Sequence, residues 1–335
     1  MYRSLQKIFL LILILNCLPA KSQQRFRFSE PKMGSPFNLT FYAGDSVKAK
    51  QLAAAAFRLV DSLNTIFSDY LPDSELNRLS RTAGTDSFFS ASPLLFEVVA
   101  RSKKASLQSN QSFDISIGPL SRLWRNARRE KRFPSPTEVM EAKKLTGINN
   151  IILDTAQKRI KLLLPGMQLD LGGIAKGYVA QQVILFLQQQ GIPAALADAG
   201  GDLVCSNPPP GREGWLIGVN RPGSETELIE EKIAYSHGAV ATSGDLYQYL
   251  EHEGKRYSHI IDPRSGLGVP FQRNVTILAP DGATADWLAT ACSILPVSKC
   301  KKLVKQHGGG LLITELNKKG LRYTVTSGVK KRFVP

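Results

Sequence analysis

Apolar side chains recur at helical spacing early in the chain, whereas strand-like runs crowd its middle. In residues 46–71, Leu52, Leu59 and Leu63 fall on one face, which predicts a long amphipathic helix. Shorter helices are predicted at residues 93–107, 119–128, 136–146, 174–189, 283–295 and 298–307. Another short helix is expected to begin near residue 73, where Asp73 or Ser74 can act as its N-cap.

Alternating or short apolar runs predict the strands. Two lie in residues 23–43, where Phe26 and Phe28 precede a loop and Phe37 and Phe41 follow it. Further strands are predicted at residues 150–153, 159–164, 167–171, 194–199, 215–219, 231–235, 239–243, 275–279, 311–314 and 323–326. Pro165–Gly166 predicts a hairpin turn between residues 159–164 and 167–171. We therefore expect an α+β fold with mixed sheets flanked by helices.

The N-terminus has the layout of a secretory signal peptide over residues 1–22. Arg3 and Lys7 precede an unbroken apolar run at residues 8–15, and small residues before Ser22 offer a cleavage site. The run is too short to span a membrane. We therefore expect export to the periplasm, with lipid attachment at Cys17 as the alternative.

The chain has a formal net charge of +15, and removal of Arg3, Lys7 and Lys21 with the signal would leave +12. No nucleic-acid-binding motif accompanies the basic clusters at residues 125–132 and 330–332, so we expect no nucleic-acid partner. An anionic ligand or membrane surface would use this charge, and a generally basic composition explains it equally well. The basic segment at residues 125–136 is expected to be an exposed loop.

Three cysteines follow the signal segment: Cys205, Cys292 and Cys300. Their spacing fits neither a metal site nor a CxxC redox site. With so few cysteines in so long a chain we expect no disulfide framework, and we expect Cys292 to be buried in the apolar run at residues 288–295.

The stretch LDLGGIAKGY at residues 169–178 is the first with chemical meaning. It reads as a strand that ends at Asp170, a tight turn at Gly172–Gly173 and a helix that carries Lys176 in its first turn. The N–H groups at such a helix start favour a bound anion such as phosphate. The alternative is an ordinary junction between two elements with a surface lysine.

Two other segments combine small, hydroxyl and ionisable residues. In one, His259 stands before two isoleucines and a rigid Asp262–Gly266 turn, which makes it a candidate proton acceptor, although a structural histidine is the alternative. In the other, Asp286 and Thr290 lie four residues apart on a predicted helix and therefore on one side of it. Their oxygens suit Mg²⁺, and a backbone carbonyl of the Gly172–Gly173 turn could be a third ligand. Ala283 and Ala289 on this helix are small enough to admit a ligand.

In order along the chain, these motifs resemble the ApbE family. The motifs are LDLGGIAKGY, AGGD at residues 199–202, ATSGD at 241–245, HIIDPRSG at 259–266 and the Asp-x-x-x-Thr pattern at 286–290. Earlier segments match as well, namely Met33–Ser35, Tyr70 with Asp73–Glu75, and Phe113–Asp114 with Gly118–Leu120. The resemblance runs from about residue 30 to residue 325.

The resemblance implies an exported FAD:protein FMN transferase that uses Mg²⁺. Such an enzyme cleaves the FAD pyrophosphate, releases AMP and links FMN through a phosphodiester to a threonine or serine of a partner protein. It also implies that residues 23–335 form a two-lobed single unit with the FAD site in its cleft. The acceptor is expected to be a subunit of a membrane redox complex.

The resemblance assigns roles to individual residues of this chain. The FAD site would be lined by Met33, Tyr70, Ser112, Phe113, Asp114, Asp170, Lys176 and Ile261. The Gly173 carbonyl, Asp286 and Thr290 would hold the metal, and His259 would accept the proton of the acceptor hydroxyl. Two other functions stay open, a Mg²⁺-dependent FAD pyrophosphatase and a non-catalytic FAD-binding protein. The second needs neither a metal nor a base, so the intact Asp286–Thr290 pair and His259 argue against it.

Overall fold

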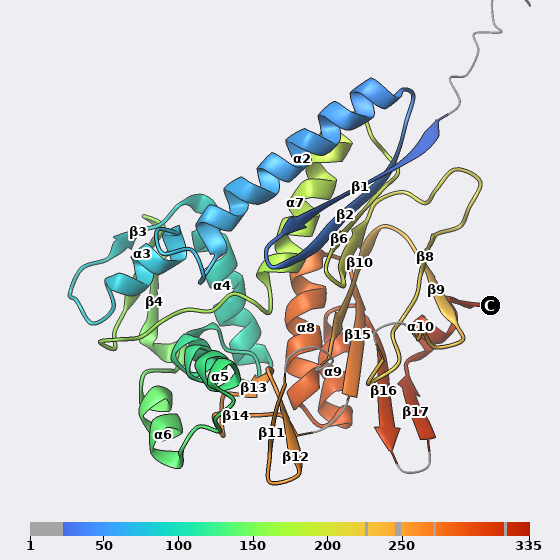
Figure 1. Cartoon of the computed structure of the whole chain (residues 1–335). Helices are drawn as coiled ribbons and strands as arrows, with labels where there is room; N and C mark the ends of the chain where they lie inside the picture. Colours follow the sequence, from blue (N-terminus) through green and yellow to red (C-terminus); the bar gives the residue numbers. More distant parts are fainter. Residues whose placement is uncertain (1–22, 225–226, 245–248, 271–272, 318–319) are drawn as a thin grey trace, which may run out of the picture.

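The computed structural model describes residues 23–224, 227–244, 249–270, 273–317 and 320–335 (Figure 1). The predicted signal peptide with Cys17 lies outside these residues, as does Asp245 of the ATSGD motif. Among the described helices, none combines the length and the apolar character needed to cross a membrane.

An eight-stranded sheet forms the centre of the molecule. Its strand order is β1-β2-β6-β7-β10-β15-β16-β17. The strands are β1 (Gln24–Lys32), β2 (Ser35–Ala43), β6 (Ala195–Ala199), β7 (Asp202–Cys205), β10 (Gly238–Ser243), β15 (Arg273–Ala279), β16 (Gly310–Asn317) and β17 (Gly320–Val325). The α+β class is confirmed, and in place of mixed sheets the described neighbours in this sheet pair antiparallel.

The two faces of the sheet are covered by different layers. Along β10, Ala239 and Ala241 belong to the core shared with the helices α2 (Ser46–Phe67), α7 (Ala175–Gln189) and α8 (Gly282–Ile294). Val240 faces the other way, toward a small sheet of β8 (Trp215–Ile217), β9 (Lys232–Tyr235) and β18 (Phe333–Val334). The short helix α10 (Ser327–Lys330) also lies on this side. Alternate side chains of one strand therefore enter two separate cores, as the period of two requires.

A second lobe packs beside the sheet, at the left of Figure 1. Its elements are α3 (Glu75–Arg81), β3 (Phe89–Ser90), α4 (Pro93–Gln108), the 3₁₀ turns η1 (Ile115–Ile117) and η2 (Ile148–Asn150), α5 (Gly118–Glu130), α6 (Pro136–Lys144), β4 (Ile151–Asp154) and β5 (Arg159–Leu162). Leu95 and Ile160 of this lobe belong to the same buried cluster as Phe37 of the sheet. One hydrophobic core therefore runs through both lobes.

The remaining elements are two hairpins and one helix. The first hairpin is β11 (Tyr249–His252) with β12 (Lys255–Ser258), and the second is β13 (Ile261–Asp262) with β14 (Leu267–Gly268). The helix α9 (Val297–Gln306) follows α8. The predicted helices and most predicted strands correspond to these elements, with ends that shift by a few residues.

The strand predicted at residues 167–171 is wrong. This segment pairs with no described strand, so Pro165–Gly166 is not a hairpin turn. Met167, Leu169 and Leu171 are buried in the main core, which produces the same alternation as a strand would. The segment is tied to η1 instead, because the Asp170 N–H donates to the Ile115 carbonyl at 2.8 Å.

The exposed loop predicted at residues 125–136 is also wrong for its first half, because α5 continues to Glu130. Trp124 and Ala127 are buried at helical spacing on this helix, and Arg125, Arg128 and Arg129 give the same segment its basic character. The helix ends at Lys131, which adopts a left-handed φ of 51°.

A disulfide joins Cys292 of α8 to Cys300 of α9, with the two Cα atoms 5.3 Å apart. We did not expect a disulfide from the cysteine count. The chain bends at Leu295–Pro296 between the helices, and this bend brings the two cysteines together. The predicted burial of Cys292 is confirmed. Cys205 is a buried free cysteine, and burial raises the pKa of its thiol to about 12.

Candidate active site

A cleft of about 900 Å³ is lined by residues of both lobes. All twelve side chains and backbone positions predicted from the sequence line it. They are Met33, Tyr70, Ser112, Phe113, Asp114, Asp170, Gly173, Lys176, His259, Ile261, Asp286 and Thr290. Residues that are far apart in the sequence therefore converge on one site, while their individual roles stay predictions.

Two glycines bring α7 and α8 into close contact below this cleft. A Cβ at Gly177 would collide with the Gly282 carbonyl, and one at Gly282 would collide with the Gly177 carbonyl. This close approach lets Asp286 Oδ2 accept the Gly177 N–H at 3.1 Å. The N–H groups at the start of α7 were expected to bind an anion such as phosphate. One of them, the Gly177 N–H, instead donates to a carboxylate of the protein.

Asp286 shares its surroundings with a second buried acid, Asp202 at the start of β7. Burial raises the pKa of Asp286 well above its usual value, and the charge of Asp202 raises it further, against the Gly177 N–H and Lys176. Burial also raises the pKa of Asp202, against the opposing charge of Lys176 and with a contribution from Asp198. Ionisation of both Asp202 and Asp286 places two negative charges close together in a buried site. A bound cation would stabilise these charges.

The predicted metal ligands Gly173, Asp286 and Thr290 line the same cleft as Asp202. A Cβ at Gly173 would come within 2.8 Å of Thr290 Oγ1, so only glycine lets the backbone approach that hydroxyl. A carboxylate, a hydroxyl and a backbone carbonyl are oxygen donors of the kind Mg²⁺ binds with water. No group of three or more His, Cys, Asp or Glu side chains forms a metal cluster within the described ranges. The oxygen donors present at the cleft fit Mg²⁺.

Ala283 and Ala289 have a different role from the one predicted. Both are buried in the main core, and neither lines the cleft. Their small size serves the packing of α8 against its neighbours, and the cleft side of α8 is formed by Asp286 and Thr290.

The segment before η1 contributes two polar side chains to the cleft. Asp114 has a structural role, and the Ser112 hydroxyl is available to a ligand. Asp114 Oδ1 accepts the N–H and the hydroxyl of Ser116, at 2.8 and 2.7 Å, and so caps η1. Burial raises the pKa of Asp114, against these hydrogen bonds. The buried Ser112 hydroxyl has no hydrogen-bond partner within the described part of the chain. A bound ligand would supply one, as buried polar groups require.

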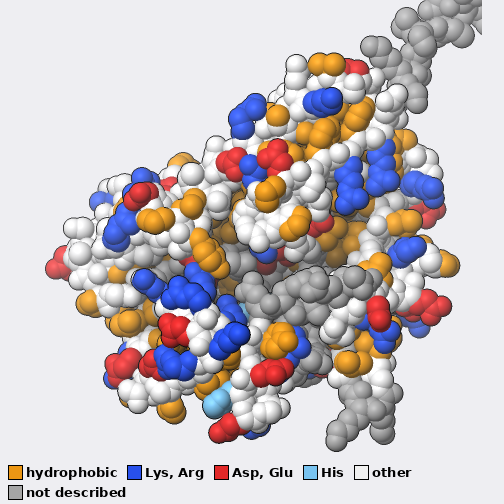
Figure 2. All heavy atoms as spheres, in the orientation of Figure 1, with side chains coloured by type: hydrophobic (Ala, Val, Ile, Leu, Met, Phe, Trp, Pro, Cys, Tyr) orange, Lys and Arg blue, Asp and Glu red, His pale blue; other side chains and the backbone are white. Residues whose placement is uncertain are grey.

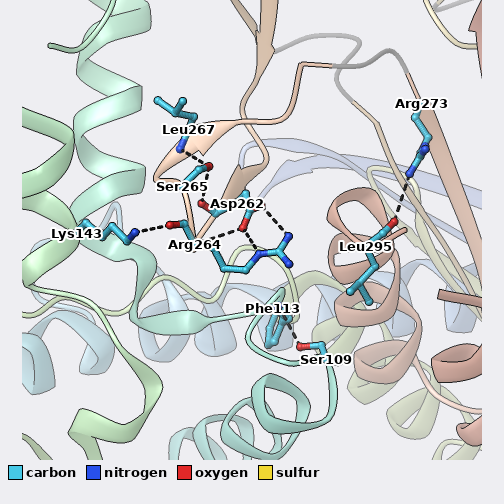
Figure 3. Close-up of polar contacts among 9 residues, drawn as sticks. All are labelled: Ser109, Phe113, Lys143, Asp262, Arg264, Ser265, Leu267, Arg273 and Leu295. Atoms are coloured by element: carbon cyan, nitrogen blue, oxygen red, sulfur yellow. Dashed lines mark hydrogen bonds and ion pairs between the residues drawn. The ribbon is translucent and has the colours of Figure 1, made fainter. Parts of the chain in front are cut away.

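His259 lies between β12 and β13, on a segment held at both ends. The Ile260 N–H donates to Ser258 Oγ at 3.1 Å, and the Ile260 carbonyl accepts the Val269 N–H at 2.9 Å. In the following turn, Asp262 accepts hydrogen bonds from the backbone and guanidinium of Arg264 (Figure 3). The predicted rigid turn is therefore present, and it directs Arg264 toward Asp262.

Two residues that line the cleft, Asp202 and Arg125, were not predicted as site residues. Asp202 closes the AGGD motif, so its position was marked, but nothing in the sequence shows that it faces Asp286. Arg125 fell in the overlap of the helix predicted at residues 119–128 and the exposed loop predicted at residues 125–136, and no role was assigned to it. It lies on α5 and lines the cleft beside Tyr70.

The fold defines an α+β protein whose two lobes both line a cleft that contains oxygen donors. The model of the ApbE family matches residues 33–313. The chain belongs to the ApbE family, which confirms the resemblance of its motifs.

Relatives and solved structures agree with this assignment. The chain is 30% identical over 283 residues to the FAD:protein FMN transferase of Klebsiella pneumoniae, covering 84% of this chain and 86% of the relative. It is 30% identical over 293 residues to that of Vibrio cholerae, covering 85% of each. The solved flavin transferase ApbE of Vibrio cholerae matches with a TM-score of 0.81 and 26% identity, over 92% of this chain and 99% of that one. The ApbE protein of Thermotoga maritima matches with a TM-score of 0.82 and 27% identity, over the same shares.

Proposed function

We propose that this protein is a Mg²⁺-dependent FAD:protein FMN transferase. It cleaves the FAD pyrophosphate, releases AMP and attaches FMN through a phosphodiester to a threonine or serine of a partner protein. Family membership supports the transfer of FMN. The observation that carries the proposal for this chain is the convergence of Asp286, Thr290, Lys176 and His259 on one cleft.

Cleavage of the FAD pyrophosphate requires the protein mainly to position the reactants and to neutralise the phosphate charge. Asp286, Thr290 and the Gly173 carbonyl would hold Mg²⁺, which supplies Lewis-acid polarisation of the phosphate oxygens when bound. Lys176 places a positive charge beside the same pocket, where the pyrophosphate carries its negative charge. Ser112 offers its hydroxyl to the ligand.

His259 is assigned the proton transfer. Its imidazole would take the proton of the acceptor hydroxyl as that oxygen bonds to the phosphorus of the FMN half. The bond from this phosphorus to the bridging oxygen breaks at the same time, and AMP leaves with the electron pair. A positioned base of this kind contributes about 10²–10⁴-fold.

The acceptor is expected outside the cytoplasm. The predicted signal peptide at residues 1–22 directs the chain to the periplasm, and the alternative at Cys17 would anchor it to the membrane. A flavin-carrying subunit of a membrane redox complex would meet the enzyme in either case.

Incubation of the purified protein with FAD, Mg²⁺ and membranes from a host strain that lacks it separates the possible functions. Covalent flavin fluorescence on an acceptor polypeptide in a denaturing gel supports the transferase. Free FMN and AMP without labelled protein would indicate an FAD pyrophosphatase instead. Unchanged FAD would indicate a carrier and overturn the proposal.

A further inference from the structure

Tyr70 stands at the cleft as an exposed aromatic side chain on a fixed loop. Its side chain keeps 67% of its surface exposed, unlike most large apolar residues of the chain. The loop is held by Ser68 Oγ, which accepts the N–H groups of Tyr70 and Leu71 at 3.1 and 3.2 Å. Asn77 Nδ2 donates to the carbonyls of Asp69 and Leu71 at 3.1 and 2.8 Å. An exposed ring on so well-bonded a loop is suited to contact a ligand.

One face of this ring is covered by Arg125. The guanidinium carbon lies 3.9 Å from the centre of the Tyr70 ring, which is a close cation–π contact. Arg125 comes from α5 in the second lobe, and Lys and Arg side chains gather over this region of the surface (Figure 2). The contact therefore links the end of α2 to a helix of the other lobe, across the edge of the cleft.

The guanidinium itself forms ion pairs with two acids. Arg125 Nη2 lies 2.6 Å from Asp69 Oδ2 and 4.0 Å from Asp170 Oδ2. Burial raises the pKa of Asp69 and the charge of Asp170 raises it further, while the hydrogen bond from Arg125 lowers it. The charge of Arg125 is thus largely balanced by neighbouring carboxylates. We therefore expect the guanidinium of Arg125 to contribute to the site mainly through its planar surface and less through its charge.

We propose that Arg125 is a positioning residue that holds the Tyr70 ring as a flat platform on which one planar ring of FAD stacks. This inference rests on the proposed function, since it takes FAD as the ligand. With Arg125 against one face and Asp69 fixing the guanidinium, the other face of Tyr70 is ready before the ligand arrives. A ligand that stacks on a preorganised ring loses less conformational freedom on binding.

The test is the dissociation constant of FAD, measured by titration calorimetry on the full mature chain with Mg²⁺ present. Arg125→Met should weaken FAD binding roughly fivefold, in the range of a cation–π contact with a neighbouring ring. The KM for FAD should rise by a similar factor while kcat changes little. Arg125→Lys keeps the ion pair but not the planar face, so it should restore thermal stability yet recover the affinity only in part.

Two further variants separate positioning from other effects. In a Tyr70→Ala background, Arg125→Met should cause no additional loss of affinity, because the platform is already gone. Arg129→Met changes an exposed arginine of the same helix outside the cleft, and it should leave both affinity and KM unchanged.

Equal losses from Arg125→Met with and without Tyr70 would overturn the inference, since they would mean that the guanidinium acts on FAD directly. Unchanged FAD affinity in Arg125→Met would overturn it as well. The two affinity outcomes do not depend on FMN transfer, because FAD binding is measured without an acceptor. A wild-type protein that binds FAD but labels no acceptor would refute FMN transfer and leave the stacking result intact.

Discussion

The Asp286 carboxylate serves both the packing of two helices and the predicted chemistry. One of its oxygens accepts the Gly177 N–H, and its charge lies near that of Asp202 in a buried setting. Two buried acids are costly to ionise together without a cation. We therefore expect the fold to tolerate the loss of the negative charge at residue 286 better than the activity does.

Asp286→Asn tests this expectation, because asparagine keeps an oxygen for the Gly177 N–H but removes the charge. Mg²⁺-dependent turnover should fall by at least ~10²-fold with the thermal midpoint nearly unchanged. The measurement is a Mg²⁺ titration of the rate, followed by a melting curve on the same preparation. Asp281→Asn is the matched control, since Asp281 caps the same helix outside the cleft and asparagine is an equally good cap. Wild-type rates in Asp286→Asn at low millimolar Mg²⁺ would refute the metal assignment.

His259 allows a second test at the scale of one residue. If it accepts the proton of the acceptor hydroxyl, His259→Ala should bind FAD with nearly unchanged affinity and transfer FMN at least ~10²-fold more slowly. The wild-type rate should rise with pH as the imidazole loses its proton, and the variant should lack this rise.

The measurement for His259 combines FAD affinity with single-turnover transfer on one preparation. His252→Ala is the control, because His252 stacks on Phe133 with ring centres 4.1 Å apart and does not line the cleft. A His259→Ala variant that loses stability and FAD affinity together, with an unchanged chemical step, would assign the histidine to packing.

The positions that line the cleft were predictable because they lie in ordered motifs, while the roles of these residues stay predictions. Asp170, Lys176, His259 and Asp286 lie in short segments that also contain glycines or small residues, and such segments indicate a site even without a structure. The partners of these residues were not predictable. The contact of Arg125 with Tyr70 joins segments more than fifty residues apart, and no local pattern encodes it.

At the scale of elements, α8 is fixed on two sides. Gly282 lets it approach α7 at one end, and the Cys292–Cys300 disulfide ties its other end to α9. Thr290 lies two residues before the disulfide. The helix that carries two predicted metal ligands is therefore anchored at both ends.

Reduction of this disulfide should lower the stability of the protein. A cross-link that closes so short a loop is worth about 2–3 kcal/mol, which corresponds to a fall of roughly 5 °C in the melting temperature. The check is a melting curve of the oxidised protein against a Cys292→Ser/Cys300→Ser double variant. Cys205 does not confuse the comparison, since its thiol stays protonated and buried in the native protein. Equal melting temperatures would contradict a stabilising disulfide.

Helices were predicted from sequence more reliably than the ends and partners of strands. The apolar face of α2 repeats over many turns, so its period was unambiguous. Residues 167–171 alternate like a strand because their apolar side chains enter the core, while their backbone pairs with no strand of the described chain. Periodicity reports which side chains are buried, and it does not report which backbone groups pair.

At the scale of the whole molecule, the disulfide agrees with the predicted export. Disulfides persist in oxidising compartments such as the periplasm. Mass spectrometry of the protein from its native cell should therefore show a mature N-terminus near Gln23 and an intact Cys292–Cys300 bond. A lipid-modified Cys17 would replace the periplasmic expectation by a membrane-anchored one, and an unprocessed Met1 would contradict export.

The sequence also predicted that both lobes form one unit around a cleft. Family motifs supplied that expectation, and the continuous core with its twelve converging residues agrees with it. The small sheet on the other face of the central sheet was harder to predict from the sequence. Its strand β18 lies far along the chain from β8 and β9, so tertiary packing brings it to them.

The most direct test of the proposed function compares AMP release with covalent FMN in one reaction. Purified protein, FAD and Mg²⁺ are incubated with an acceptor subunit identified by its flavin fluorescence, and in parallel with the same subunit carrying alanine at the labelled threonine or serine. A transferase should release AMP and form FMN-linked acceptor in equal amounts, and both should disappear with the alanine acceptor. Undiminished release of AMP and free FMN with the alanine acceptor would contradict transfer to a protein hydroxyl.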